Sequence, residues 1–154
     1  MHQGHQFVVF TLDDQLYAVS LSVVERIARM VEITPLPRAP EIVLGVINVQ
    51  GWILPVIDIR KRFHLPAREL QLSDQILIAR TSKRRVALVV DTVTEVVIPS
   101  VHEVVARELI LAQLDYVIGV VKRPDGLILI HDLDSFLSLD EEQELHDGID
   151  SLTP

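Results

Sequence analysis

Short apolar runs separated by polar turns dominate the chain. The runs are four to eight residues long and rich in Val, Ile and Leu, which is typical of strands rather than helices. Hairpin-type turns are expected at 13–15, 82–85 and 123–126, where polar, proline and glycine residues interrupt the apolar pattern. The pattern predicts a mainly β protein, with strands at 7–12, 17–21, 45–49, 52–59, 75–79, 85–90, 95–99, 116–121 and 127–130.

Helical segments are expected to be few and short. One is predicted at 20–27, and two more begin at Asp58 and Asp132, because aspartate is a favoured N-cap residue. The acidic tail is predicted to form a helix that ends at Gly148. Its carboxylates are expected on a solvated face and its leucines on an inner face: Asp140, Glu141, Glu142 and Glu144 outside, Leu139 and Leu145 inside.

The two halves of the chain repeat one pattern. A shift of 69 positions places 7–27 on 76–96 without a gap, and a shift of 74 places 45–59 on 119–133. Each half therefore consists of a hairpin, a third strand, a variable segment, a glycine-headed hairpin and an Asp-capped helix. This duplication predicts two small closed β-barrels, packed pseudo-symmetrically with a groove between them, because closure leaves no exposed sheet edges.

Composition excludes several classes of protein. The 154-residue chain has no cysteine, which rules out disulfide frameworks, thiolate metal sites and cysteine nucleophiles. Its net charge of −8 argues against nucleic-acid binding, which relies on a basic face. The N-terminal sequence lacks the pattern of a secretion signal, and no apolar run approaches the roughly 18 residues that span a bilayer. We expect a soluble protein without membrane insertion.

No arrangement of catalytic or metal-binding residues is evident. The hydroxyl residues lack a GxSxG motif, the glycines form neither GxGxxG nor a P-loop, and the histidines lack HExxH or HxH spacing. His131 beside Asp132 is the single suggestive pair, but the duplication equates His131 with Ile57, which predicts a half-buried histidine at a strand end. We therefore expect no catalytic activity, no metal and no cofactor.

The segment INVQGWILPVIDI, residues 47–59, contains the only tryptophan. Gly51 is expected in the tight turn of a hairpin, and Pro55 indicates that the second strand is an edge or is bulged at that point. The duplication places Gly126 at the position of Trp52, so the fold does not need a large side chain there. Trp52 is therefore a candidate surface anchor. The apolar residues from Met30 to Leu36 fit either the core or a partner-binding face.

Four segments resemble the CheW-type coupling proteins of bacterial chemotaxis. They are FVVFTLDDQLYAV, VVERIARMVEITPLPRAPEIVLGVINVQGWILPVIDIRKRF, VALVVDTVTEVV and YVIGVVKRPDGLILIHDLDSFL. The resemblance implies a single domain over 6–138, with halves at about 6–70 and 71–138, followed by an acidic helix or tail at 139–154. It implies two intertwined, five-stranded SH3-like barrels with a few short helices.

The same resemblance implies a non-catalytic adaptor. Such proteins join the regulatory domain of a CheA-type histidine kinase to the cytoplasmic tips of methyl-accepting chemoreceptors, in arrays at the membrane. It places a kinase interface on the first barrel, at Val24, Arg26, Ile27, Met30, Ile42, Val43 and Gly45. It places a receptor interface at the groove and the adjoining turn, at Ile33, Asn48, Gln50, Gly51, Trp52, Val90 and Ile98.

Two residues depart from the family pattern. Gln50 stands where the family usually has arginine, and Arg26 stands where the family favours glutamate. This reversal suggests altered partners, for example in a pilus-motility or other chemosensory-like pathway. A small-ligand sensor that uses the groove between the barrels is the alternative function.

Overall fold

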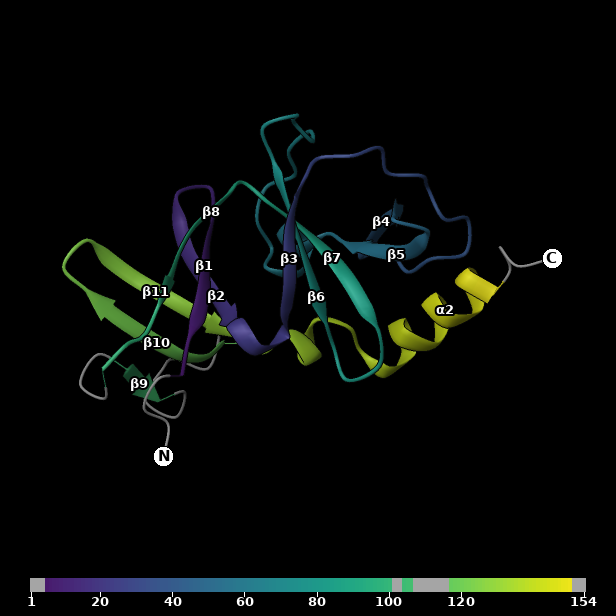
Figure 1. Cartoon of the computed structure of the whole chain (residues 1–154). Coiled ribbons are helices and arrows are strands. Elements are labelled where there is room, and N and C mark those ends of the chain that lie inside the picture. The colour runs from purple at the N-terminus through teal and green to yellow at the C-terminus, as the bar shows by residue number, and fades with distance from the viewer. Residues whose placement is uncertain (1–4, 101–103, 107–116, 151–154) are drawn as a thin grey trace.

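The computed structural model describes residues 5–100, 104–106 and 117–150. Strands make up most of it, as Figure 1 shows. The strands are β1 (Phe7–Leu12), β2 (Gln15–Ser20), β3 (Val24–Arg29), β4 (Val43–Val49), β5 (Trp52–Ile57), β6 (Gln75–Arg80), β7 (Arg85–Val90), β8 (Thr92–Val97), β9 (Val104–Ala106), β10 (Val117–Arg123) and β11 (Gly126–His131). The helices are α1 (Ile59–Arg62), α2 (Leu139–Asp150) and two 3₁₀ turns, Leu21–Val23 and Leu133–Phe136.

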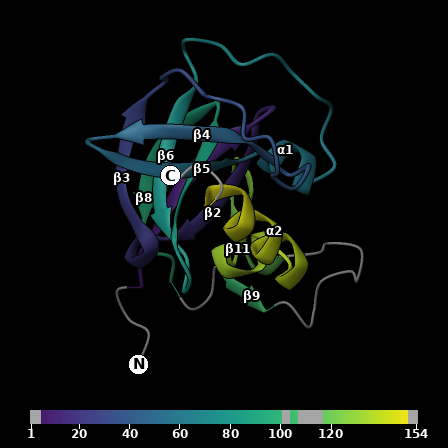
Figure 2. The same ribbon diagram turned by 90° about the vertical axis from the view of Figure 1, so that its right-hand side faces the viewer.

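The strands form two sheets that each combine both halves of the chain. The five-stranded sheet has the order β3-β6-β7-β5-β4, and the six-stranded sheet has the order β8-β1-β2-β11-β10-β9. The first hairpin of each half, β1–β2 or β6–β7, thus lies between strands of the other half (Figures 1 and 2). The predicted mainly β fold, with two SH3-like units and a few short helices, is confirmed, and the sheets are intertwined as the resemblance implied. The sheets are open, so the prediction from the duplication that the barrels are closed is wrong, and one sheet has six strands rather than five.

Strand pairing reproduces the predicted duplication in detail. Val56 pairs with Ala87 in one sheet, and Ile130 pairs with Ala18 in the other, at positions related by the two shifts. Register irregularities also repeat, because β4 and β10 are both interrupted between a valine and the glycine two positions later. The duplication is therefore a property of the backbone as well as of the apolar pattern.

Apolar side chains form three clusters, a central one and one inner cluster on the other face of each sheet. On β6, Leu77 and Ala79 join the central cluster, whereas Ile76 and Ile78 join the inner cluster of the five-stranded sheet. Successive side chains of a strand point to opposite faces, so strands buried on both faces need apolar residues at every position. This double burial accounts for the continuous apolar runs in the sequence.

The predicted helix at 20–27 is wrong. Only Leu21–Val23 form a 3₁₀ turn, and β3 follows directly. A bulge between Val24 and Arg26 lets Val24 and Ile27 pair opposite Ala79 and Leu77, two residues of the central cluster. Two apolar residues three positions apart therefore share one face of a strand, which imitates the spacing of a helix.

Pro55 lies in an interior strand and at a regular pair, although the sequence suggested an edge strand or a bulge at that point. It pairs with Val46 of β4, and β5 pairs with β7 only at Val56 and Ile57. The ladder between β5 and β7 thus begins immediately after the proline, where the missing N–H costs no hydrogen bond to β7. The two predicted N-caps are confirmed, because the side chains of Asp58 and Asp132 each accept a hydrogen bond from the first turn of the following helix.

Helix α2 packs against the sheets. Leu145 is fully buried in the central cluster, as predicted for the inner face. Glu141 forms an ion pair with Arg62, and Glu142 forms one with Arg84, so these two acids are not simply solvated as the sequence suggested. The side chain of Leu139 lies outside the described residues. No helix in the described ranges is both long enough and apolar enough to span a membrane.

Candidate protein-interaction surface

The turn between β4 and β5 has a well-defined backbone. Gln50 and Gly51 have φ angles of 51° and 90°, the positive pair that a type I′ hairpin turn requires. The side-chain oxygen of Asn48 accepts a hydrogen bond from the Gly51 N–H at 2.9 Å. Trp52 follows, paired with Val49, and 63% of its surface is exposed. The predicted hairpin is confirmed, and its turn presents Gln50 and Trp52 to solvent.

A hollow of about 250 Å³ lies beside this turn. All five strands of the five-stranded sheet contribute to it. Leu54 and Ile78 are buried members of the inner cluster and supply an apolar floor, while polar side chains occupy the rim. We refer to it as the Trp52 hollow, and its lining residues are Glu25, Arg26, Val49, Gln50, Trp52, Leu54, Ile78 and Arg85.

Arg85 fixes one wall of the Trp52 hollow. Its guanidinium carbon lies 5.0 Å from the centre of the Trp52 ring, in a cation–π contact, and its Nε lies 2.8 Å from Glu25 Oε1. Sequence reasoning missed Glu25 and Arg85, because the chain separates Trp52 from Arg85 by 32 intervening residues. The parallel pairing of β5 with β7 brings them together, and no local motif signals that pairing.

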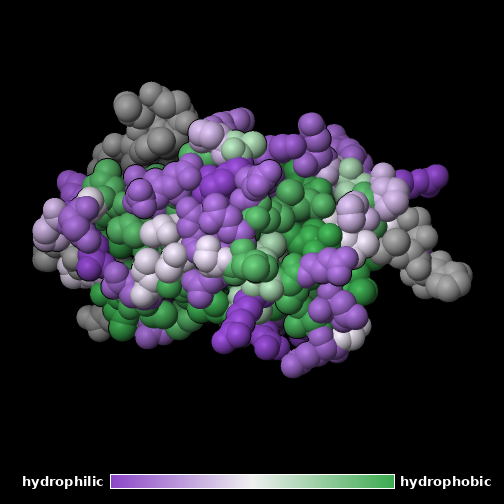
Figure 3. All heavy atoms as spheres, turned by 90° about the horizontal axis from the view of Figure 1, so that it is seen from above, coloured by the Kyte–Doolittle hydropathy of each residue, from purple (hydrophilic) through white to green (hydrophobic). Residues whose placement is uncertain are grey.

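Apolar side chains are also exposed at positions that the duplication relates. Ile27 on β3 and Val96 on β8 are 46% and 50% exposed, and Ile53 on β5 and Leu127 on β11 are 46% and 50% exposed. Both β3 and β8 are outer strands of their sheets. Figure 3 shows that, on one face, apolar groups reach the surface in separate areas between polar ones. Each sheet therefore offers a comparable apolar contact surface.

The residues predicted at the kinase interface differ in how far they are buried. Arg26 and Ile27 are exposed, while Val24 and Met30 are partly buried against the central and inner clusters. Ile42, Val43 and Gly45 are buried, so they can support a surface but not form one. A Cβ on Gly45 would lie 2.3 Å from the Thr34 carbonyl oxygen, which explains the need for glycine there.

The residues predicted at the receptor interface are more exposed. Asn48, Gln50, Gly51, Trp52 and Ile98 are accessible, and Ile33 is partly buried against the inner cluster. Val90 is fully buried in the central cluster, so the prediction that it lines a groove is wrong. Its strand β7 is an interior strand with both faces covered. The structure also brings Arg26 of the first predicted interface beside Gln50 and Trp52 of the second.

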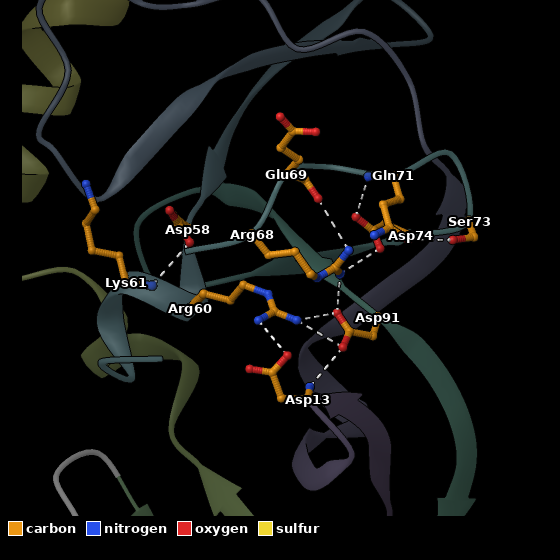
Figure 4. A network of polar contacts seen from close by, with 10 residues as sticks. All are labelled: Asp13, Asp58, Arg60, Lys61, Arg68, Glu69, Gln71, Ser73, Asp74 and Asp91. Atoms are coloured by element: carbon orange, nitrogen blue, oxygen red, sulfur yellow. Dashed lines mark hydrogen bonds and ion pairs between the residues drawn. The ribbon is translucent and has the colours of Figure 1, made fainter. Parts of the chain in front are cut away.

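A second hollow, of about 410 Å³, borders a network of ion pairs (Figure 4). Arg60 donates hydrogen bonds to Asp13 at 2.8 Å and to Asp91 at 2.7 Å. Arg68 donates to Asp74 at 2.9 Å and also to Asp91. These arginines already have carboxylate partners, so they offer little free charge to a ligand. The small-ligand alternative is therefore not favoured.

The network changes the acidity of its members. Burial by itself would raise the pKa of Asp91, but hydrogen bonds from Arg60, the Asp13 N–H and Arg68 outweigh it and lower the pKa. Burial would lower the pKa of Arg60, and its bonds to the two carboxylates raise it instead. The network therefore stays ionised and ties the β1–β2 turn, α1 and the β7–β8 junction together.

His131 is more deeply buried than the sequence suggested. It ends β11 with 4% of its surface exposed, and its ring stacks on Phe63 with 4.3 Å between ring centres. Its Nδ1–H donates a hydrogen bond of 3.2 Å to the Leu129 carbonyl, because a carbonyl can only accept. Burial lowers the pKa of His131 to about 4. His131 is thus a neutral core residue.

Comparisons with known proteins agree with this fold. A family model described as the CheW-like domain matches residues 6–141. The chemotaxis protein CheW of Rhizobium meliloti (strain 1021) is 30% identical over 142 residues, which cover 91% of this chain and 92% of the relative. The chemotaxis protein CheW of Bacillus subtilis (strain 168) is 31% identical over 144 residues, which cover 91% of each chain.

A solved structure shows the same architecture. The scaffolding protein TtCheW from Thermoanaerobacter tengcongensis superposes with a TM-score of 0.79 at 30% sequence identity, covering 89% of this chain and 94% of the other. The family match spans the hairpins, both sheets and the start of α2. On this evidence the chain belongs to the CheW-like family.

Proposed function

We propose that the chain is a non-catalytic adaptor that couples a CheA-type histidine kinase to methyl-accepting chemoreceptors. Membership of the CheW-like family supports this role, as does the similarity to a solved protein described as a scaffold. The pathway would be chemotaxis or a related chemosensory system. The protein would act in the cytoplasm, beside membrane-bound receptor arrays.

One observation carries the proposal, namely the paired exposure of apolar residues on the two outer strands. Ile27 and Val96 pair opposite Leu77 and Val8, which belong to the central cluster. Residues paired across strands share a face, so both exposed side chains lie on the side of that cluster. An adaptor needs more than one docking surface, and the duplication supplies two related ones.

These surfaces suit protein partners. Apolar side chains that stay half exposed beside polar groups are typical of interfaces that form and dissociate. A receptor tip would place apolar side chains of a helix against such a surface, whereas the kinase regulatory domain would cover a second patch. We expect an interface of about 800 Å² on each partner.

Binding measurements test the proposal. The chain is titrated calorimetrically with CheA-type regulatory domains and receptor cytoplasmic fragments from its own genome. The Ile27→Ser variant should bind at least one partner about 10-fold more weakly, because it removes an exposed apolar contact while leaving the core intact. The control variant Leu72→Ser changes a side chain that is 94% exposed in the loop before β6, and it should bind normally. Failure of the unmodified chain to bind any of these partners would overturn the proposed function.

A further inference from the structure

We infer that the Trp52 hollow docks a segment of a partner protein that carries a carboxylate beside a large apolar side chain. The inference rests on the proposed adaptor function, because that segment would belong to an array partner. It concerns the chemistry of recognition, which family membership leaves open. Size, charge and an internal comparison within the chain support it.

The size of the hollow suits a single side chain. Its volume of about 250 Å³ lies below the roughly 300–1,000 Å³ typical of pockets that enclose a small-molecule ligand. Leu54 and Ile78 form an apolar floor, being 4% and 2% exposed, and the exposed Trp52 ring forms a wall. A large apolar side chain inserted from outside would lose its contact with water against these three residues.

The charge of the hollow favours an acidic partner. Arg26 and Arg85 face it with one carboxylate, Glu25, which pairs with Arg85 at 2.8 Å. Arg26 is exposed and forms no ion pair within the described part of the chain. Gln50 adds a neutral amide at the rim. The hollow therefore has one surplus positive charge, in a chain whose net charge is −8.

The second half of the chain shows the alternative arrangement. The position related to Arg26 holds Glu95, and Glu95 forms an ion pair of 3.5 Å with Arg123 on β10. The six-stranded sheet thus neutralises the charge at this site internally. In the five-stranded sheet the corresponding charge is reversed, and Val49 stands at the position related to Arg123. The duplication therefore identifies the free charge of Arg26 as a feature of one sheet only.

Arg26, Arg85 and Trp52 together can recognise such a segment. A guanidinium binds a carboxylate through paired hydrogen bonds, and Trp and Arg are among the residues that contribute most at protein interfaces. The apolar side chain would enter between Trp52 and the floor while its neighbouring carboxylate reaches Arg26. Because the charge pair lies at an exposed rim, affinity should fall as salt concentration rises.

Reversing the charge of Arg26 on this chain, and of its acidic contact on the bound fragment, tests the inference. Arg26→Glu should weaken binding of the kinase or receptor fragment at least 10-fold, while Arg26→Lys, which keeps the charge but loses the paired hydrogen bonds, should have a smaller effect. Trp52→Ala should weaken binding about 30-fold or more with an unchanged melting temperature, because the side chain is largely exposed. Lys61→Glu, the same charge change on α1 outside both sheets, is the matched control and should bind normally. On the kinase or receptor fragment that binds, each Asp or Glu beside a large apolar residue is replaced with Arg in turn. One of these replacements should restore affinity for the Arg26→Glu chain.

The outcomes separate this inference from the proposed function. If the unmodified chain binds no kinase or receptor fragment, the adaptor function itself fails. If it binds but Arg26→Glu and Trp52→Ala bind equally well, the adaptor function stands and the inference is wrong. If the variants alter only self-association, measured by sedimentation, the occupant is a second copy of this chain and the inference is also wrong.

Discussion

Acidification should weaken the fold through one buried histidine. His131 stacks on Phe63 and lies near Tyr17 and Phe136, an environment that disfavours its charged form. Its pKa is about 4 in the folded protein, against about 6.5 in the unfolded chain. A depressed folded-state pKa means that stability is complete above pH 6.5 and is lost as the pH falls toward 4.

The magnitude follows from the two pKa values. Between pH 7 and pH 5, proton uptake by unfolded His131 should lower the free energy of unfolding by about 2 kcal/mol. For a chain of this length, that corresponds to a decrease in melting temperature of about 4–8 °C. Below pH 4 the loss should level off, because the histidine is then protonated in both states.

The His131→Phe variant isolates this effect. Phenylalanine keeps the ring packing and removes the titration, although it loses the hydrogen bond to Leu129, worth about 1 kcal/mol. Urea unfolding is followed by circular dichroism at pH 7, 6 and 5. The free energy of unfolding should fall more steeply with decreasing pH for the original chain than for the variant. His146→Gln, which replaces an exposed histidine on α2, is the matched control for the loss of an imidazole. Parallel stability curves for the original chain and His131→Phe would refute the reasoning.

Two further substitutions should be measured by thermal unfolding. Arg60→Ala should cost about 2 kcal/mol, because it removes a largely buried guanidinium and its charged hydrogen bonds to Asp13 and Asp91, while Arg68 still pairs with Asp91. Lys61→Ala, whose ion pair is exposed, should cost about 0.5 kcal/mol or less. Equal losses would contradict the role of the network. Gly45→Ala should cost about 3 kcal/mol or more, because its Cβ would collide with the Thr34 oxygen, while Gly51→Ala meets no atom within 4 Å and should cost only about 1–2 kcal/mol of backbone strain. A smaller loss at Gly45 than at Gly51 would show that the segment around Thr34 moves freely.

Local sequence patterns predicted the positions of strands and turns better than they predicted which strands pair with each other. The hairpins, the two Asp caps and the duplication depend on residues close in the chain or on repeated spacing, and the structure confirms them. The segment at 20–27 misled because a bulge gave a strand the apolar spacing of a helix. No local signal indicates that β2 pairs with β11 of the other half, so the exchange of hairpins could not be derived from spacing.

The candidate site was predicted in part for the same reason. Trp52 and Gln50 lie in or beside a turn that the sequence identifies. Arg26 was noticed because it is positively charged where the family favours glutamate. Arg85 faces them only because β5 and β7 pair in parallel, a tertiary contact. Val90 was misplaced because an apolar run on an interior strand looks the same whether its second face is open or covered.

The exchange of hairpins between the sheets has a consequence for synthesis of the chain. Ala18 of β2 pairs with Ile130 of β11, 112 positions later. At the roughly 5–20 residues per second of translation, the first hairpin must wait about 6–22 s for its neighbour to be made. During that interval β2 keeps an unpaired edge on a nascent chain rich in Val and Ile. In the finished protein β11 covers that edge, so an unpaired edge of β2, which can pair with another chain, is a feature of the nascent chain alone.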